Sequence, residues 1–413
     1  MHKPILIGPF RQLLTMANLP LKGAIRDDQL QLIEHAGIIV ENQKIKAIGN
    51  YSLLTKDALQ ENFEIQEIIG DFVAMPGMVD AHTHICYAGS RAGDYAMRLS
   101  GMSYLEIAAQ GGGIWSTVTK TREISEEGLF LNTLKRAEIL LHSGTTTVEI
   151  KSGYALNVAG ELRMLEIINR VNDQLPIDIV ATCLAAHMKP KDFDGTHMDY
   201  LKVLTEKLLP VIRDRKLAQR IDIFIEKSAF SASESLAYLQ KAKVLGFEIT
   251  IHADQFTTGG SEIACQIGAL SADHLEASTE KEINLLAKSN VIPVCLSGAS
   301  LGLGMPFAPA RQLLDAGASL AIASDWNPGS APMGDLLAQA AIIGAYEHLS
   351  LAETLAAITF RAAAALNLHD RGVLSEGMLA DVIAFSSSDY REILYRQGKL
   401  VPKYVWKKGK KIF

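Results

Sequence analysis

From residue 78 onward, the sequence repeatedly alternates a short β-rich run with a longer segment of helical periodicity. This alternation is typical of βα units built around a parallel sheet. The predicted strands are residues 78–86, 145–150, 177–187, 221–226, 248–253, 271–275, 291–297 and 319–325. Together these eight units cover about 250 residues, the typical length of a (β/α)8 barrel. We therefore predict an α/β chain whose main part is a (β/α)8 TIM barrel.

The helical patterns between these strands have recognisable ends. Residues 126–142 stop before Gly144, residues 200–215 are amphipathic, and residues 233–245 stop at Gly246. Residues 279–289 begin with a capping box of Thr279 and Glu282. Further helical patterns over residues 333–368 are expected to complete the outer ring of the barrel.

The two ends of the chain differ from the barrel part. Residues 37–49 are predicted to form strand, turn and strand, and the tail contains short β-rich runs at 381–385 and 403–406. Neither flank is long enough to bury a two-layer core easily on its own. We therefore predict that residues 1–74 and 372–413 form one composite β-sandwich domain beside a barrel domain of residues 75–371.

Composition and charge exclude several classes of partner. The chain has 40 basic and 46 acidic side chains, a net charge of -6, which provides no basic field for nucleic acid. The apolar stretch 291–310 is interrupted by Pro293 and several glycines, which argues against a membrane span. The four cysteines form no C-x-x-C pair, and the first residues lack the apolar core of a signal peptide. We expect a cytoplasmic protein without a nucleic-acid or membrane partner.

Histidines gather where a barrel enzyme places its chemistry, at the carboxyl ends of the strands. Five of the eleven histidines and one aspartate fall there: His82, His84, His187, His252, His274 and Asp325. On a strand, the period of two turns both imidazoles of His82-Thr83-His84 to one side, which suits two ligands of one metal. Three imidazoles and one carboxylate, with room for water, are typical of a hydrolytic Zn or Fe site.

Longer motifs add a resemblance that spans nearly the whole chain. The runs MPGMVDAHTH, TIHAD, SADH, ASDWNPGSAP and GVLSEGMLADV resemble the amidohydrolase superfamily. Within it, the combination of HTHICYAGSRAGDYAMRLSGMSYLEIAAQGGGI, TTTVEIKSGYAL, LAAH and DWNPGS is similar to the imidazolonepropionases. The superfamily motifs alone would not select a substrate, whereas the longer motifs are specific.

This resemblance implies a cofactor, a reaction and a set of site residues. One metal, Zn or Fe, would be held by His82, His84, His252 and Asp325. The substrate would be 4-imidazolone-5-propanoate, hydrolysed at its cyclic amide to N-formimidoyl-L-glutamate in histidine degradation, and the protein would be a homodimer. The implied substrate contacts are Arg91, Tyr154, His187, Gln255, Asn327, Gly329 and Ser330.

Elementary chemistry agrees with several of these roles. A propionate needs a cation, and the planar fork of Arg91 can bind a carboxylate with two hydrogen bonds. Asp325 and His274 are candidates to take the proton of a metal-bound water and deliver it to the departing ring nitrogen. His187 is expected to donate to the carbonyl oxygen as negative charge builds there.

Single positions in the sequence disfavour two alternatives within the superfamily, a deaminase and a two-metal enzyme. Deaminase relatives carry H-x-x-E on the fifth strand, whereas this chain has Gln255 in place of the Glu. Because an amide cannot transfer a proton, this disfavours a nucleobase-type deaminase and leaves the identity of the general base open. Two-metal relatives use a carboxylated lysine on a middle strand, and neither Lys151 nor Lys227 stands at the expected place. We expect one metal, with both lysines structural or on the surface.

A third alternative lies outside catalysis altogether. Some amidohydrolase-like barrels serve as scaffolds for assembly without catalysing a reaction. Such a chain would be expected to have lost one or more of the four implied metal ligands, and this sequence retains them all. We therefore favour a metal-dependent hydrolase.

Overall fold

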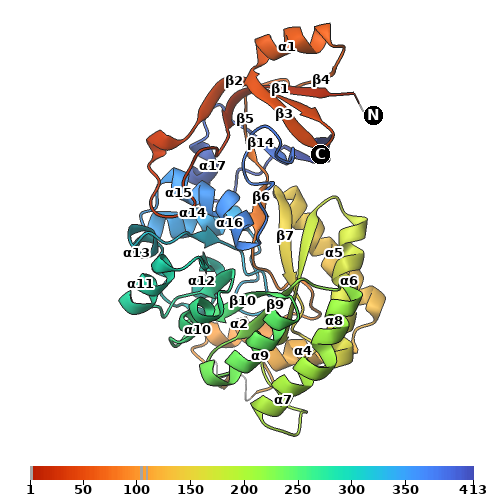
Figure 1. The fold of residues 1–413 in the computed structure, drawn as a ribbon, viewed down its shortest axis with the longest axis vertical. Coiled ribbons are helices and arrows are strands. Elements are labelled where there is room, and N and C mark those ends of the chain that lie inside the picture. Colours follow the sequence, from red (N-terminus) through yellow and green to blue (C-terminus); the bar gives the residue numbers. More distant parts are fainter. Residues whose placement is uncertain (1–2, 103–105, 108–109) are drawn as a thin grey trace.

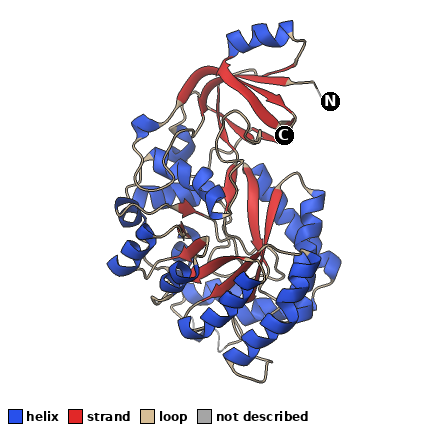
Figure 2. Ribbon diagram, viewed as in Figure 1, coloured by secondary structure: helices blue, strands red, loops and turns tan. Residues whose placement is uncertain are grey.

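The computed structural model describes residues 3–102, 106–107 and 110–413, and this part of the chain contains two separate eight-stranded sheets (Figures 1 and 2). Residues 103–105 and 108–109 of the first long motif lie outside the described residues. The first sheet is wholly parallel, and its strands are neighbours in chain order: β6 (Met78–Asp80), β7 (Thr145–Lys151), β8 (Asp178–Ala186), β9 (Arg220–Phe224), β10 (Glu248–Ala253), β11 (Ser271–His274), β12 (Ile292–Cys295) and β13 (Ala321–Ile322). This arrangement confirms the predicted (β/α)8 barrel.

Helices surround the parallel sheet (Figure 2). In the described residues they are α2 (Ala92–Leu99), α4 (Ile114–Glu123), α5 (Glu126–His142), α6 (Val158–Gln174), α7 (His197–Val203), α8 (Leu209–Arg215), α9 (Ala232–Val244), α10 (Gly260–Ile267), α11 (Glu280–Lys288), α12 (Ser297–Leu303), α13 (Ala310–Asp315), α14 (Leu336–Tyr346), α15 (Leu351–Ala357) and α16 (Phe360–Ala365). The capping box of Thr279 and Glu282 is present at the start of α11, as the sequence predicted.

The barrel closes through the residues that carry the histidine motif. Thr83 and Trp326 form an isolated parallel bridge between the chain after β6 and the chain after β13. Asp325 N donates to the carbonyl of His82, and His84 N donates to the carbonyl of Trp326, each at 3.0 Å. The seam between the first and last strands therefore brings His82, His84 and Asp325 together.

The first and last barrel strands are shorter than the sequence predicted. β6 ends at Asp80 rather than at residue 86, and β13 ends at Ile322 rather than at residue 325. Side chains take the place of the regular ladder here, because Ser324 N donates to the Asp80 carboxylate and Thr83 N donates to the Glu149 carboxylate. The predicted helix over residues 200–215 also divides, with a π-helical turn (Leu204–Leu208) before Pro210, which lacks an N–H for a regular helix.

The second sheet unites the two ends of the chain, which lie close together in Figure 1. Its strand order is β16 (Lys410–Lys411), β15 (Tyr404–Lys407), β14 (Val382–Ser386), β5 (Phe72–Pro76), β1 (Ile5–Leu14), β2 (Leu32–Glu41) and β3 (Lys44–Asn50), and β4 (Glu64–Glu67) also pairs with β1. The antiparallel pairing of β5 with β14 joins the N-terminal part to the C-terminal part. Two short helices, α1 (Tyr51–Gln60) and α17 (Glu392–Tyr395), and a 3-10 turn (Asp27–Gln29) accompany this sheet.

The terminal sheet bends so that its two halves enclose a core. Three strand spacings separate β15 from β1, which would hold their residues roughly 14 Å apart in a flat sheet. The rings of Phe10 and Trp406 nevertheless lie 5.9 Å apart, and both side chains are fully buried. One bent sheet thus provides both layers of the predicted sandwich, while the exact boundaries at residues 74/75 and 371/372 stay a prediction.

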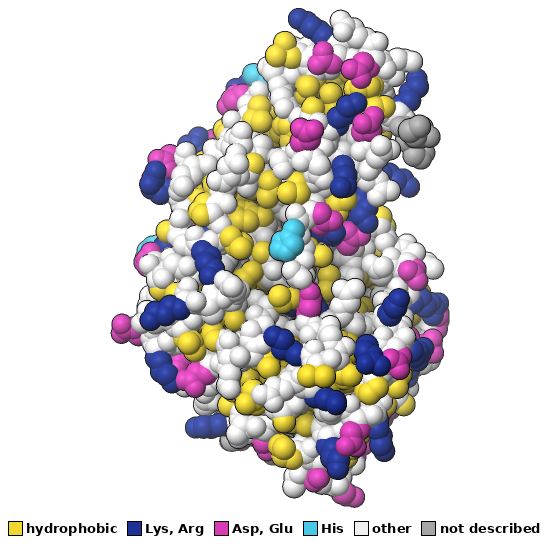
Figure 3. Space-filling model, in the orientation of Figure 1, with side chains coloured by type: hydrophobic (Ala, Val, Ile, Leu, Met, Phe, Trp, Pro, Cys, Tyr) yellow, Lys and Arg dark blue, Asp and Glu magenta, His cyan; other side chains and the backbone are white. Residues whose placement is uncertain are grey.

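The surface carries charges of both signs. On the face shown in Figure 3, basic and acidic side chains alternate with apolar ones, so no single sign dominates that face. None of the helices in the described residues is both long enough and apolar enough to cross a bilayer.

Candidate metal centre and active site

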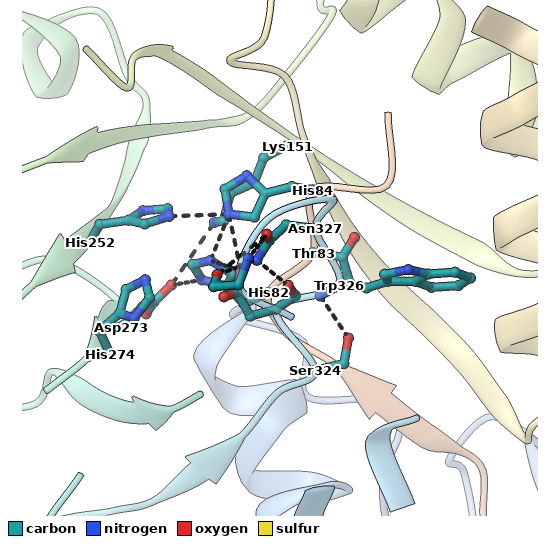
Figure 4. A network of polar contacts seen from close by, with 12 residues as sticks. His82, Thr83, His84, Lys151, His252, Asp273, His274, Ser324, Trp326 and Asn327 are labelled. Atoms are coloured by element: carbon teal, nitrogen blue, oxygen red, sulfur yellow. Dashed lines mark hydrogen bonds and ion pairs between the residues drawn. The ribbon is translucent and has the colours of Figure 1, made fainter. Parts of the chain in front are cut away.

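Three buried histidines point their Nε2 atoms at one another at the carboxyl end of the barrel (Figure 4). The Nε2 of His84 lies 3.1 Å from that of His82 and 3.2 Å from that of His252. Asp325 Oδ1 lies 3.4 Å from His84 Nε2 and 3.7 Å from His82 Nε2. The structure thus brings together the four side chains that the sequence analysis proposed as metal ligands.

The hydrogen-bonding arrangement of these imidazoles fits a metal ion. His82 Nδ1 lies 2.6 Å from Asp273 Oδ2, and His252 Nδ1 lies 2.9 Å from Asp222 Oδ2. A carboxylate at Nδ1 keeps the proton there, so the Nε2 atoms of both rings present lone pairs toward His84. Tetrahedral zinc with Zn–N bonds of 2.0–2.1 Å would separate ligand nitrogens by about 3.3 Å. Converging lone pairs at this spacing repel one another unless a cation lies between them.

Burial shifts the pKa values of these four groups, and the shifts decide which of them are free to bind a cation. It lowers the pKa of His252 to about 3, although Asp222 opposes the shift, and it holds the pKa of His82 and His84 well below the usual range. Burial also raises the pKa of Asp325 to about 7, a shift that His274 and Asn327 oppose. Near neutral pH the imidazoles therefore have free lone pairs, whereas Asp325 still competes for a proton.

This competition predicts how metal affinity depends on pH. Since a ligand must lose its proton to bind a metal, affinity is expected to fall about tenfold per pH unit from pH 7 to pH 5. Above pH 8 it should be flat, because the pKa of Asp325 is about 7 and the histidines need no deprotonation there. Titration calorimetry of the metal-free protein with Zn²⁺ would measure it. Asp325→Asn should bind more weakly and without this slope, and a slope retained in that variant would contradict the assignment to Asp325.

The backbone is strained where the site residues leave their strands. Asp254, His274 and Asp325 have φ values of 53°, 89° and 48°, in the left-handed region that L residues rarely adopt. Such conformations persist only where surrounding contacts impose them, and they cluster at functional sites.

A cavity of about 700 Å³ opens directly above the histidine group. Every residue that the sequence analysis placed in the site lines this cavity except His82, which lies fully buried beneath it. The lining residues among them are His84, Arg91, Tyr154, His187, His252, Gln255, His274, Asp325, Asn327, Gly329 and Ser330. Apolar side chains cover part of the wall, among them Trp115, Phe224 and Phe256.

Known proteins resemble this chain over nearly its whole length. The profile of the amidohydrolase family matches residues 73–412. The chain is 40% identical to the imidazolonepropionase of Bdellovibrio bacteriovorus, with 100% of this chain and 97% of that protein covered. It is 42% identical to the imidazolonepropionase of Deinococcus deserti over 83% of this chain and 85% of that protein. The chain belongs to the imidazolonepropionase family.

Solved structures of more distant proteins share the fold of this imidazolonepropionase family member. An atrazine chlorohydrolase from Arthrobacter aurescens TC1 complexed with zinc superposes with a TM-score of 0.71 at 17% identity, covering 99% of this chain and 95% of the other. A guanine deaminase from C. acetobutylicum gives a TM-score of 0.73 at 15% identity, covering 99% and 100%. At such low identity these neighbours confirm the barrel and the terminal sheet, and they carry no information on the substrate.

In this imidazolonepropionase family member, Arg91 lies where the loop after the first barrel strand meets the loop after the last one. Its Nε donates to Asp94 Oδ2 at 2.8 Å, and the same carboxylate oxygen accepts from Gly113 N at 2.9 Å. A Cβ added at Gly329 would lie 2.1 Å from Arg91 Nη1, so only glycine allows this close approach. Asp94 therefore fixes the guanidinium at the cavity wall and ties it to the glycine-rich loop.

Asn327 organises the loop after the last strand. Its side-chain oxygen accepts from the backbone N–H groups of Gly329 and Ser330 at 2.7 and 2.8 Å, and its Nδ2 donates to the Asp325 carbonyl. The amide is thus engaged with its own loop, a role that the sequence analysis did not foresee. Whether Asn327, Gly329 and Ser330 contact substrate stays a prediction.

His187 is set up differently from the expected donor role. Its Nδ1 lies 3.1 Å from the carbonyl oxygen of Gly153, which can only accept, so the ring proton is on Nδ1 and Nε2 carries a lone pair. Burial lowers the pKa of His187 to about 4, so a second proton is disfavoured at neutral pH. The neutral ring is therefore suited to accept a hydrogen bond in the cavity, and the prediction that it donates is not supported by this geometry.

The pKa of His274 is shifted in the opposite direction to that of His187. Burial by itself would lower its pKa, but the Glu276 carboxylate, 3.5 Å from Nδ1, and Asp325 raise it above the usual value. A histidine that is readily protonated beside a carboxylate of raised pKa is suited to proton transfer. The catalytic role that the sequence analysis gave to His274 stays a prediction.

Tyr154 and Gln255 occupy two sides of the cavity. The buried ring of Tyr154 lies 5.5 Å from that of His187 and 6.0 Å from that of His84. Gln255 precedes a turn whose backbone N–H groups, from Phe256 and Thr257, donate to the buried Glu226 carboxylate. Glu226 thereby fixes the turn that carries Gln255.

Sequence reasoning missed the buried charges that support the histidines. Asp222, Asp273, Glu149 and Lys151 are all buried inside the barrel. The signal was present in the sequence, because these charged residues stand within predicted barrel strands, and a charge is buried only when it is paired. Of the two roles expected for these lysines, structural or surface, Lys151 has the structural one, and Lys227 is exposed at the cavity mouth.

Proposed function

We propose that this protein is an imidazolonepropionase, which hydrolyses the cyclic amide C–N bond of 4-imidazolone-5-propanoate to give N-formimidoyl-L-glutamate. The observation that carries the proposal is the placement of the His82, His84, His252 and Asp325 group and of the Arg91 guanidinium around the same cavity. Sequence identity of 40% over the full chain to a relative of that name supports the same reaction.

The cavity suits a small anionic ring. Arg91 is held by Asp94 at Nε, and its terminal nitrogens can bind a propionate with two hydrogen bonds. Because the protein as a whole carries a charge of -6, capture of an anion depends on local positive groups. Tyr154, Gln255 and the loop with Asn327, Gly329 and Ser330 are proposed to position the ring between Arg91 and the histidine group.

The residues of the chain divide the proton transfers between them. A bound metal would supply a water of lowered pKa and polarise the ring carbonyl. Asp325 accepts the proton that the attacking water loses, and the protonated His274 donates one to the ring nitrogen as the C–N bond breaks. Asp325 then returns its proton to His274. His187, with its Nε2 lone pair, accepts a hydrogen bond from the substrate.

The finer properties of the protein are part of the same proposal. Zn and Fe both accept imidazole and carboxylate ligands, so either metal suits this donor set, at one ion per chain. Lys151 Nζ is ion-paired with the carboxylates of Glu149 and Asp222, which supports a mononuclear site. We further propose a cytoplasmic homodimer without nucleic-acid or membrane partners, in keeping with the four free cysteines and the lack of a dominant charge.

The direct test is turnover by the purified, metal-loaded protein. Incubation with 4-imidazolone-5-propanoate should consume the ring chromophore, and nuclear magnetic resonance should identify N-formimidoyl-L-glutamate as the product. Removal of the metal with a chelator should stop the reaction, and adding Zn²⁺ or Fe²⁺ should restore it. A metal-loaded, folded sample that leaves this ring closed would refute the substrate assignment.

A further inference from the structure

A single lysine is fully buried beneath the metal centre among three carboxylates. Lys151 Nζ lies 2.7 Å from Glu149 Oε1, 2.9 Å from Asp222 Oδ2 and 3.9 Å from Asp273 Oδ2. All four side chains have at most 1% of their surface exposed. Figure 4 shows Lys151 and Asp273 beside the histidine group.

Two of these carboxylates contact histidines of the candidate ligand group at Nδ1, the ring nitrogen on the side away from the converging Nε2 atoms. Asp222 Oδ2 lies 2.9 Å from His252 Nδ1, and Asp273 Oδ2 lies 2.6 Å from His82 Nδ1. In each case the same carboxylate oxygen contacts both Lys151 and the imidazole. Lys151 is therefore one contact away from the atoms that set the tautomer and the orientation of these two ligands.

The third carboxylate connects Lys151 to the H-x-H segment. Glu149 Oε2 accepts from Thr83 N at 3.2 Å, and Thr83 lies between His82 and His84. The backbone of β7 adds two further bonds, because Lys151 N donates to Thr83 O and Thr83 Oγ1 donates to Glu149 O. Through its three carboxylate partners, Lys151 is thus linked to all three ligand histidines.

Three carboxylates cannot stay this close in a buried site without a cation. Mutual repulsion and desolvation would otherwise drive them to rotate apart, take up protons or admit water. Apart from Lys151, Asp273 Oδ2 contacts the neutral hydroxyl of Thr250 and the imidazole of His82, and neither group carries a permanent positive charge. The ammonium group of Lys151 provides the opposite charge within ion-pair distance of all three.

We propose that Lys151 is a positioning residue of the metal centre: its ammonium group holds Asp222, Asp273 and Glu149 in place, and these carboxylates fix the ligand histidines so that their Nε2 lone pairs converge. Lys151 does not line the cavity, and its contacts with the ligand histidines run through its carboxylate partners. The inference rests on the metal site of the proposed function and not on its substrate, so it can be tested in the absence of substrate.

The test compares metal binding by three variants of the full chain. Lys151→Met removes the ammonium group, and Glu149→Gln combined with Lys151→Met removes one positive and one negative charge together, which protects folding. Lys407→Met is the matched control, because Lys407 is also buried and ion-paired, with Asp381 and Asp178. Asp178 is the first residue of β8, whereas the histidine group lies at the carboxyl ends of the strands. Competition with a chromophoric chelator gives the Zn²⁺ affinity, and the visible spectrum of the Co²⁺-loaded protein reports ligand geometry.

Both Lys151 variants are expected to bind Zn²⁺ about 10- to 100-fold more weakly than the parent, the usual effect of losing an outer partner of metal ligands. The Co²⁺ bands should shift, and the rise in melting temperature on adding metal should shrink. Lys407→Met should lower the melting temperature with and without metal alike and leave affinity and spectrum unchanged.

Three outcomes would overturn the inference. Parent-like affinity and Co²⁺ spectrum in a folded Lys151 variant would show that the lysine does not position the ligands. An equal loss of affinity in Lys407→Met would show a general effect of stability. Failure of both Lys151 variants to fold, with metal present, would make Lys151 a requirement of the fold. If the parent itself binds no metal, the proposed function fails instead.

Discussion

Replacing His252 with alanine is expected to abolish metal retention and to lower kcat/KM for the proposed substrate by roughly 10³-fold or more. The variant loses the Nε2 atom that lies 3.2 Å from that of His84 in the ligand group. It also leaves the Asp222 carboxylate, now facing a void, without its imidazole partner. Elemental analysis of the purified variant after dialysis would measure the metal, and ring consumption would measure the activity.

The control for this variant is a histidine on one of the helices that surround the barrel. His142 is exposed at the end of α5, where it stacks on Phe413, and His142→Ala should retain both metal and activity. Circular dichroism would show that both variants are folded. A His252→Ala protein that keeps a full complement of tightly bound metal would exclude His252 from the ligand set.

Replacing Arg91 with methionine is expected to lower kcat/KM by about 10²- to 10³-fold while the metal content stays at the parent level. Methionine retains much of the length of the side chain but removes the charge that would pair with the propionate. It also leaves Asp94 without its partner at 2.8 Å, although Gly113 N still donates to that carboxylate. The loss should fall mainly on KM if Arg91 holds substrate and transition state equally.

A second arginine provides the comparison. Arg163 is partly buried like Arg91, but it donates to the backbone carbonyls of Thr121 and Ile124 and does not line the cavity. Arg163→Met is expected to reduce stability without changing kcat/KM of the folded protein. Loss of metal from Arg91→Met would instead identify Arg91 as a structural residue of the barrel mouth, and unchanged kinetics would remove it from the substrate site.

Much of the fold follows from local patterns. The βα alternation located every barrel strand, and β10 matches its predicted bounds of 248–253. Strand ends were less accurate where side chains replaced the ladder, as at Asp80 and Ser324. Hydrophobic periodicity reports which face of an element is buried, but it does not report such non-local side-chain bonds to the backbone.

The site was predictable as a list of residues and not as an arrangement. The motifs selected histidines and Asp325 from distant segments because chemistry requires those residue types. Sequence alone did not show that Asn327 is engaged with its own loop or that Gly153 fixes the tautomer of His187. Both features depend on the positions of backbone atoms, and these positions cannot be inferred from the pattern of side chains in the sequence.

The sequence by itself determined the barrel, the joining of both termini and the choice of the candidate metal ligands, because periodicity and residue type are local properties. Only the tertiary structure decided how the charges inside the barrel are balanced. Lys151, Glu149, Asp222 and Asp273 come from β7, β9 and β11 and meet only when these parallel strands curve around a common axis. Their distances determine how each charge is stabilised in a medium without water, and those distances exist only in the folded chain.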